Sequence, residues 1–401
     1  SRRGADLFKG GADAGDIAQG ALGDCWFLAS IAAAAAHQSG GIIPTTFGKS
    51  NPSGERGVYA ARFYKDGVWR EVLVNDKVPR AGGEPLFARS TDPNEAWVSV
   101  IEKAYAKLHG GYQALEGGFI HEGLADLTGG VPSAYWFSVP SVQQKVASGE
   151  LFQDLLRWNS EGHLLGAGSQ AGTDTQVIDG IVQGHAYSIL DVAEVDGFSL
   201  LKLRNPWAKT EWEGPWSDAD TKNWTPRRKA KVGFVAGDDG EFWMGFADFV
   251  REFRNLYVCK LFPESWSAVG GTSAWAGASA GGSPNNETCK DNPQFLLSVT
   301  SPTQVHITLS RDKFVSGVEH IGFGLYKAGP GGGRIDPRRL RAGDRLATSG
   351  QYSNLRTVNL ETHLAPGKYV VVPTTFKPGQ EGAFSVVVHS EKSVGFNELQ
   401  P

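Results

Sequence analysis

The sequence predicts an α+β protein in which a mixed region of helices and strands is followed by an antiparallel β-sandwich. Between residues 25 and 253, segments with helical spacing of apolar residues alternate with segments in which every second residue is apolar. Beyond Tyr257, short apolar segments separated by turn residues follow one another, as in a β-sandwich. The 401 residues and a hydrophobic content of 40% suffice for two or three domains with buried cores.

Three segments of the first region are predicted helices. Residues 25–37 are rich in Ala, Leu, Ile and Trp and stop at Ser39-Gly40-Gly41, which indicates a buried helix. Residues 94–108 place an apolar stripe on one helix face, and residues 151–158 form a shorter helix. The second half of 242–253 is also expected to be helical.

Predicted strands complete the first region. Residues 58–64 and 69–74 alternate around Lys65-Asp66-Gly67, which predicts a hairpin. Residues 183–192 and 199–204 form a second pair joined at Asp196-Gly197, and residues 205–240 are expected to be irregular. The Gly-rich segment 166–172 is expected to be a loop. The strands predicted for the sandwich are 295–299, 305–309, 321–326, 357–360, 368–372 and 383–389.

Composition excludes several classes of protein. The net charge of −4 is far from that of a typical nucleic-acid-binding protein. The longest apolar run, residues 26–36, is much shorter than the roughly 20 residues that cross a bilayer, so we expect no transmembrane segment in this chain. Neither a Cys-x-x-Cys nor a His-Glu-x-x-His spacing occurs, which leaves a zinc site without support.

The three cysteines, Cys25, Cys259 and Cys289, are too few and too uneven for a disulfide framework. We therefore expect a reducing compartment and a cytoplasmic protein. Met244 is the only methionine and the chain starts Ser-Arg-Arg-Gly, so we expect a processed or partial chain, with any membrane tether lying outside it.

Cys25 is the strongest candidate for a catalytic group. It stands at the first turn of the predicted helix, where the positive end of the helix dipole favours a thiolate. Gly20 and Gly23 allow the sharp loop that presents the sulfur. Considered alone, Cys25 is more often a small buried apolar residue.

Two further residues change that balance. His185 opens one strand of the second predicted pair and Asn205 closes the other, so both are expected at the same open end. An Asn oxygen can accept one imidazole N–H while the other ring nitrogen takes a proton from the thiol. Pro206 ends the strand, and Trp207 can cover the His–Asn bond against water.

Gln19 is a candidate oxyanion donor. It lies six residues before Cys25, and a loop of that length can bring its amide beside the sulfur. Together with the backbone N–H of Cys25, it could stabilise the negative oxygen of a tetrahedral intermediate.

These residues resemble the calpain family of cysteine proteases. The resemblance covers residues 4–256 densely and 257–401 more weakly. It rests on Gln19-Gly-Ala-Leu-Gly-Asp-Cys-Trp-Phe-Leu, Gly184-His-Ala-Tyr-Ser, Arg204-Asn-Pro-Trp, Gly214-Pro-Trp-Ser-Asp, Asp239-Gly-Glu-Phe-Trp-Met, Glu102-Lys-Ala-Tyr-Ala-Lys-Leu-His-Gly and Asp126-Leu-Thr-Gly-Gly. Similarity to the plant-type calpains (phytocalpains) rests on Leu165-Gly-Ala-Gly-Ser, Ile181-Val-Gln-Gly-His and Val372-Pro-Thr-Thr.

The resemblance implies a papain-like protease core of two subdomains, residues 1–118 and 119–256, and a C2-like β-sandwich over 257–401. It implies a calcium-dependent thiol protease, a hydrolase in which Cys25 is the nucleophile, His185 the base and acid, and Asn205 the orienting residue. Gln19 would be the oxyanion donor. Gly118, Gly184 and Trp207 would line the substrate cleft.

The same resemblance implies two Ca²⁺ sites. The residues that correspond to the first are Lys9, Gly11, Asp16 and Glu95, and those that correspond to the second are Glu211, Asp218, Gly237, Asp239 and Glu241. Oxygen donors of this kind suit Ca²⁺. The sequence departs from the family in having no EF-hand loop pattern. It also places Ala14 where classical calpains have an Arg that helps to link the two subdomains.

The expected partners are protein substrates. Acidic phospholipid is a further expected partner, through the arginines Arg334, Arg338, Arg339, Arg341 and Arg345, which could instead contact the protease core. Two alternatives stay open: a transglutaminase, which also uses a Cys–His pair, and an inactive calcium- and lipid-binding adaptor. Asn205 and Gln19 favour the protease over the first, and the complete catalytic set disfavours the second.

Overall fold

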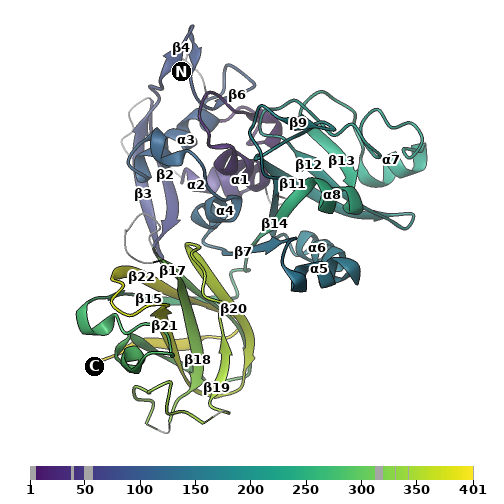
Figure 1. Ribbon diagram of the computed structural model, residues 1–401. Coiled ribbons are helices and arrows are strands. Elements are labelled where there is room, and N and C mark those ends of the chain that lie inside the picture. Colours follow the sequence, from purple (N-terminus) through teal and green to yellow (C-terminus); the bar gives the residue numbers. More distant parts are fainter. Residues whose placement is uncertain are drawn as a thin grey trace. The chain divides into compact units, whose positions relative to one another are not determined.

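The computed structural model describes residues 6–37, 40–48, 57–311, 319–329, 331–341 and 343–400 (Figure 1). The chain divides into two compact units. The first comprises residues 1–64 and 69–261, and the second comprises 65–68 and 262–401. Helices are confined mainly to the first unit, and the second is built from strands, which confirms the α+β class.

A six-stranded antiparallel sheet organises the first unit, in the order β13-β12-β11-β8-β14-β7. Its strands are β7 (Val131–Trp136), β8 (Leu164–Ser169), β11 (Ala186–Val195), β12 (Phe198–Arg204), β13 (Glu241–Gly245) and β14 (Phe253–Lys260). The predicted turn between β11 and β12 forms at Asp196 and Gly197, which have φ values of 51° and 82°. His185 and Asn205 therefore end up at the same end of the pair.

Eight α-helices are described in the first unit. They are α1 (Cys25–Ala35), α2 (Ile42–Thr46), α3 (Trp97–Leu108), α4 (Ile120–Thr128), α5 (Pro140–Ala147), α6 (Glu150–Ser160), α7 (Pro226–Val232) and α8 (Phe246–Glu252). Short strands also pair: β1 (Ile17–Ala18) with β6 (Arg89–Ser90), β2 (Val58–Lys65) with β3 (Val68–Asn75), β4 (Arg80–Ala81) with β5 (Glu84–Pro85), and β9 (Val177–Ile178) with β10 (Ile181–Val182).

Helix α1 is the centre of this arrangement and lies beside β11 and α4 (Figure 1). Every residue after Cys25 in α1 is buried, as expected for a helix that is apolar all round. Two hydroxyls fix its position: Ser188 of β11 donates to the Ala29 carbonyl at 2.9 Å, and Ser30 donates to the Ile120 carbonyl at 3.0 Å. The helix that carries Cys25 is thereby attached to the strand that follows His185.

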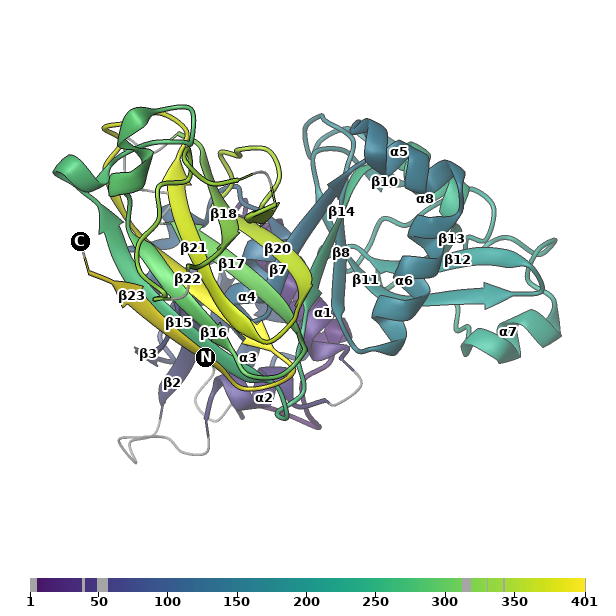
Figure 2. The same cartoon turned by 90° about the horizontal axis from the view of Figure 1, so that it is seen from below.

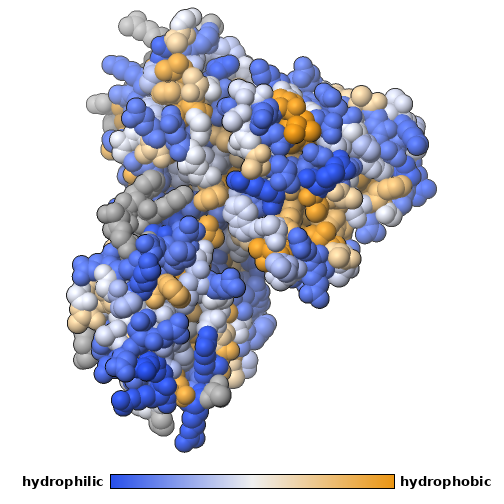
Figure 3. All heavy atoms as spheres, in the orientation of Figure 1, coloured by the Kyte–Doolittle hydropathy of each residue, from blue (hydrophilic) through white to orange (hydrophobic). Residues whose placement is uncertain are grey.

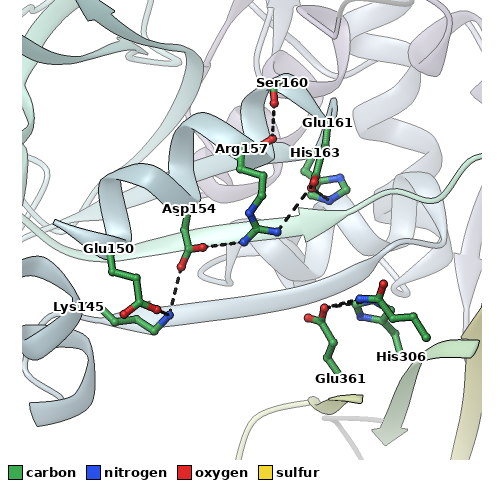
Figure 4. Close-up of polar contacts among 10 residues, drawn as sticks. Lys145, Glu150, Asp154, Arg157, Ser160, Glu161, His163, His306 and Glu361 are labelled. Atoms are coloured by element: carbon green, nitrogen blue, oxygen red, sulfur yellow. Dashed lines mark hydrogen bonds and ion pairs between the residues drawn. The ribbon is translucent and has the colours of Figure 1, made fainter. Parts of the chain in front are cut away.

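The described part of the first unit has two large hydrophobic cores and a smaller cluster around Trp216, Trp224 and Trp243. One surrounds α1 and α3 and includes Phe27, Trp97 and Tyr105. The other lies between the sheet and helices α6 and α8 and includes Leu155 and Phe249. Helices α5 and α6 are joined by ion pairs, in which Lys145 contacts Glu150 and Asp154 (Figure 4).

The Gly-rich segment expected to be a loop is instead partly a central strand. Gly166 and Gly168 lie in β8, between β11 and β14. A Cβ at Gly166 would lie 2.8 Å from the Ile120 side chain, and one at Gly168 would lie 2.6 Å from Oδ1 of Asn255. Close approach of α4 and β14 therefore requires glycine here, and this tertiary requirement was not visible in the local pattern.

The second unit is an antiparallel β-sandwich, seen from a second direction in Figure 2. One sheet has the order β15-β22-β17-β20 and the other β19-β18-β21-β16-β23. The strands are β15 (Ser267–Trp275), β16 (Gln294–Val299), β17 (Thr303–Arg311), β18 (Ile321–Lys327), β19 (Arg345–Thr348), β20 (Thr357–Leu364), β21 (Gly367–Thr375), β22 (Gly382–Ser390) and β23 (Val394–Leu399). Phe295, Ile307 and Val371 lie in its core.

All six strands predicted for this region are present within one to four residues at their ends. His306 of β17 faces Glu361 of β20 at 3.7 Å, one of the cross-strand contacts drawn in Figure 4. In the described part of both units, no helix combines the length and apolarity needed to cross a bilayer.

Candidate active site

Cys25 is the first residue of α1, as the sequence predicts. Of the three cysteines, it alone is not buried, and all three are free thiols. Its sulfur lies near the start of β11, where the backbone of Ala186 lowers the thiol pKa in part. The nucleophile therefore sits next to the residue that follows His185.

His185 and Asn205 meet at the open end of β11 and β12. The His185 Nε2 atom lies 3.0 Å from Oδ1 of Asn205, and both side chains are buried. The same Oδ1 accepts the backbone N–H of Trp207 at 3.0 Å, while the Asn205 amide donates to the Thr210 carbonyl at 3.1 Å. Asn205 is thus held at both ends of its side chain and can fix the imidazole.

The Trp207 ring packs against the imidazole, with 4.8 Å between ring centroids. Tyr187 contacts the imidazole edge-on, at 5.3 Å. These rings shield the His185–Asn205 hydrogen bond from water. Shielding from water strengthens this hydrogen bond, which holds the imidazole in one tautomer.

Cys25 and His185 do not hydrogen bond to each other in the described part of the chain. Burial raises the pKa of Cys25 to about 11, and burial lowers the pKa of His185 to about 4. Both groups are therefore neutral across the physiological range in this arrangement. Formation of a thiolate–imidazolium pair requires the two groups to approach within about 2.6–3.2 Å or through one water.

Gln19 lies in the loop that leads to α1. Its Nε2 donates to the Leu22 carbonyl at 2.7 Å, and its Oε1 is buried without a hydrogen-bond partner among the described residues. One N–H of the amide remains for another acceptor, because an amide nitrogen carries two. The position is compatible with an oxyanion donor.

Gly118 and Gly184 are positions where a side chain does not fit. A Cβ at Gly118 would lie 2.3 Å from the Trp26 ring, next to the nucleophile. At Gly184, φ is +60° and a Cβ would lie 2.4 Å from the Gly172 carbonyl oxygen. Beside Gly184, β9 presents Val177 and Ile178 to solvent, and an apolar patch marks this hairpin in Figure 3.

Two hydrogen bonds to backbone carbonyls join the part of the chain around Cys25 to the part around His185. Arg204, fully buried, donates from Nη2 to the Ile17 carbonyl at 2.9 Å. The Gln19 N–H donates to the Pro206 carbonyl at 3.1 Å. Ala14 is buried.

Among the residues of the first expected calcium site, Glu95 and Asp16 lie close enough to interact. Burial raises the pKa of Glu95, and the Asp16 carboxylate raises it further. Glu95 Oε1 accepts the Lys9 backbone N–H at 2.8 Å, and Asp16 Oδ2 accepts the Trp97 indole N–H at 3.2 Å. Gly11 lies in the same loop with φ at +120°.

Among the residues of the second expected site, Glu211, Asp218 and Asp239 face one another. Burial raises the pKa of Glu211 and of Asp218, and repulsion from Asp239 contributes to both shifts. Asp218 accepts the Gly237 N–H at 2.9 Å. Glu241 differs, because its carboxylate pairs with Lys202 at 2.5 Å.

These donor sets fit a hard cation in their chemistry, since they offer carboxylate and carbonyl oxygens without sulfur or imidazole. In the described residues, however, no group of three or more His, Cys, Asp or Glu side chains is arranged to hold a metal ion. The assignment of the nine residues named from the sequence as Ca²⁺ ligands therefore stays a prediction.

Sequence reasoning missed the segment that follows Trp207. Ala208 and Thr210 adopt φ values of 56° and 65° although neither is Gly. This turn directs the Thr210 carbonyl to the Asn205 amide. Strain of this kind at a site is a recognised signal in a structure, but these residue types give no hint of it in sequence.

Comparison with known proteins agrees with this geometry. Residues 2–260 match the calpain family cysteine protease family, and residues 271–389 match the calpain large subunit domain III family. The chain is 42% identical to the calpain-type cysteine protease ADL1 of Oryza sativa subsp. japonica and covers 19% of it, with 97% of the chain aligned. It is 41% identical to DEK1 of Arabidopsis thaliana, with 98% of the chain and 19% of DEK1 aligned.

An animal relative aligns over a larger share of its own length. The chain is 36% identical to the calpain-1 catalytic subunit of Homo sapiens, over 97% of the chain and 59% of that protein. The chain thus spans about a fifth of the plant relatives and more than half of the animal one. The match over the whole protease core shows that this chain belongs to the calpain family of cysteine proteases and carries a calpain domain III, the C2-like sandwich, after it.

Proposed function

We propose that this chain is a calcium-dependent endopeptidase that cleaves proteins with a Cys25–His185–Asn205 triad. The observation that carries the proposal is the His185–Asn205 bond beside a cysteine at a helix N-terminus. Limited proteolysis of folded protein substrates is the activity expected from this set.

The reaction begins when His185 takes the thiol proton of Cys25 and the sulfur attacks the scissile carbonyl carbon. The resulting oxyanion lies between the Cys25 N–H and the Gln19 amide. His185 then gives its proton to the leaving amine as the C–N bond breaks, which leaves a thioester. Water, deprotonated by His185, hydrolyses the thioester and regenerates the thiol.

Calcium dependence is supported by the paired carboxylates in two loops. Glu95 with Asp16, and Glu211 with Asp218 and Asp239, repel one another where they are partly buried. A Ca²⁺ ion held by these carboxylates would supply the positive charge that offsets this repulsion. Since a ligand favours the conformation that binds it better, these loops would favour a conformation in which Cys25 and His185 are close.

Casein proteolysis in Ca²⁺ and in EGTA, with Cys25→Ser as control, tests the proposal. Cleavage that needs both Ca²⁺ and Cys25 supports it. Incorporation of a primary amine into casein without peptide cleavage would support a transglutaminase instead. Failure of a thiol-directed inhibitor to label Cys25 in Ca²⁺ would support an inactive adaptor.

We also propose that arginines of the second unit bind acidic phospholipid. Arg339 has a side chain 85% exposed, and Arg338 has a side chain 41% exposed that lies 3.5 Å from the Glu287 carboxylate. Arg334 is different, since it donates hydrogen bonds to the Lys290 and Asn292 carbonyls at 2.9 and 2.8 Å and stabilises the fold there. A cytoplasmic location is part of the proposal, in keeping with three free cysteines.

A further inference from the structure

The N-cap residue of the helix that carries Cys25 is an acid that does not cap. Asp24 accepts the backbone N–H groups of Phe27 and Leu28 through its carbonyl, at 2.9 and 3.1 Å. Its side chain makes no capping bond, although Asp is a preferred N-cap residue. The side chain is 0% exposed. Neither of its carboxyl oxygens accepts a hydrogen bond from an N–H or hydroxyl group of the described residues.

The group that faces Asp24 is a second buried acid. Glu102 of α3 is 1% exposed, and its Oε1 accepts the Ala88 backbone N–H at 2.9 Å. The two carboxyl groups lie close enough for each to shift the pKa of the other. Two acids can share a hydrogen bond only when one of them keeps its proton, and two carboxylates cannot both be charged at close range in a buried site.

No compensating cation acts on the pair in the part of the chain that the structure describes. The titratable groups around them are Cys25 and the Tyr112 hydroxyl, which is buried without a partner. The Tyr112 ring packs on Phe87 at 4.4 Å and covers this side.

Glu102 also links the pair to the loop that holds Gln19. The Ala88 N–H that it binds follows Leu86, whose carbonyl accepts the Ala21 N–H at 3.0 Å. A Cβ at Gly20 would lie 2.2 Å from the Phe87 carbonyl oxygen, so the two loops are in close contact. The pair is therefore linked through backbone contacts both to the nucleophile and to the loop of the candidate oxyanion donor.

We propose that Glu102 retains its proton and donates it in a hydrogen bond to Asp24, so that the pair holds at most one negative charge under the first turn of α1 and governs how readily Cys25 ionises. Asp24 and Glu102 are positioning residues in this scheme, because neither touches the substrate. The inference rests on the proposed role of Cys25 as nucleophile.

The direction of the effect follows from the position of the charge. Burial raises the pKa of Asp24 to about 7, and burial together with Asp24 keeps the pKa of Glu102 well above its usual range. The charge on Asp24 in turn adds to the rise in the Cys25 pKa. Deprotonation of Asp24 near neutral pH therefore opposes ionisation of the thiol.

Two isosteric variants separate this scheme from a purely structural role. Asp24→Asn removes the charge while keeping the shape, so the thiol pKa should fall by about one unit, a tenfold gain in thiolate at a given pH. Glu102→Gln still donates to Asp24 and keeps the charge, so its thiol pKa should stay at the parent value or above. The control Asp126→Asn alters another buried acid, which accepts the Tyr105 hydroxyl at 2.8 Å, and should leave the thiol unaffected.

The measurement is the pH dependence of Cys25 alkylation by iodoacetamide, read by mass spectrometry of the Cys25 peptide. Cys259 and Cys289 are buried and do not compete. A lower midpoint in Asp24→Asn alone supports the scheme. Equal midpoints in Asp24→Asn and the parent, or the same shift in Asp126→Asn, overturn it.

An infrared measurement covers the case in which Asp24→Asn does not fold. At pH 8 the parent should show the band of a protonated carboxyl that Glu102→Gln lacks, and absence of that difference band overturns the scheme. Failure of the catalytic assignment is distinguished separately. If alkylated Cys25 still permits casein cleavage, Cys25 is not the nucleophile, whatever the variants show.

Discussion

Oδ1 of Asn205 accepts two hydrogen bonds, one from Nε2 of His185 and one from the backbone N–H of Trp207, each at 3.0 Å. This shared acceptor joins the orientation of the imidazole to the turn that places the indole over it. With Nε2 committed as a donor, Nδ1 of neutral His185 is the nitrogen that can accept the thiol proton.

Asn205→Ala should reduce kcat while leaving some activity. The variant removes the acceptor that fixes the imidazole tautomer. General acid–base catalysis contributes on the order of 10²–10⁴-fold to the rate, and the variant loses only the share that depends on orientation of the imidazole. Peptide hydrolysis at saturating substrate measures this, with His185→Ala as the complete-loss reference. An unchanged kcat would show that Asn205 does not orient the base.

His185 should make the first unit less stable in acid. Its pKa falls from 6.5 to about 4 on burial, so between these values the unfolded chain binds a proton that the folded chain does not. This stabilisation is fully present above pH 6.5 and is lost as the pH falls toward 4. Thermal unfolding across this range should show a shallower pH dependence in His185→Gln than in the parent. Replacement of the exposed His320 by Gln is the control and should leave the slope unchanged.

Gly184→Ala should destabilise the protein more than Gly197→Ala. Both glycines have positive φ, +60° and +82°, where Ala is strained by roughly 1–3 kcal/mol. Only at Gly184 does the added Cβ meet backbone, the Gly172 carbonyl oxygen at 2.4 Å, whereas Gly197 has open space. Differential scanning calorimetry compares the two Tm values. A similar Tm in both variants would contradict a close approach of 172 and 184.

Calcium titrations of activity should distinguish the acids that bind Ca²⁺ from acids that only lie nearby. Glu211→Ala, Asp239→Ala and Asp16→Ala should each raise the Ca²⁺ midpoint, because each removes a carboxylate donor. Glu213→Ala, an exposed acid in the same loop as Glu211, is the matched control and should titrate like the parent. Mg²⁺ should substitute poorly, since it requires a smaller octahedral shell. Undiminished activity in excess EGTA, or parental midpoints in all three variants, would refute calcium regulation through these residues.

Vesicle pelleting tests the lipid proposal. Replacing Arg338, Arg339 and Arg341 by Gln should reduce pelleting with phosphatidylserine vesicles, and added salt should weaken parental binding, because exposed charges are screened over about 8 Å at physiological ionic strength. Arg334→Gln should instead lower stability, as its donors hold the carbonyls of Lys290 and Asn292. Equal pelleting of the triple variant and the parent would end the proposal.

The sequence by itself predicted part of the secondary structure and named the residues expected at the site, and it placed Cys25 at the start of a helix as the structure has it. The Asp196-Gly197 turn between two apolar segments already placed His185 and Asn205 at one end of a strand pair, and the 3.0 Å contact between their side chains follows from that register. Six of the nine described sandwich strands were equally predictable, because period-two patterns bounded by turn residues are local signals. The strands β15, β19 and β23 were not predicted.

Only the tertiary structure decided the features that depend on residues far apart in the chain. Gly166 and Gly168 look like loop residues locally but form a central strand, because α4 and Asn255 approach too closely for any side chain. Asp24 is the N-cap residue of α1 in the structure, yet its carboxyl group makes no capping bond and interacts with Glu102, 78 positions later in the chain. Local patterns encode backbone conformation, whereas the charge and desolvation at Cys25 are set by which distant groups the packed core brings against it.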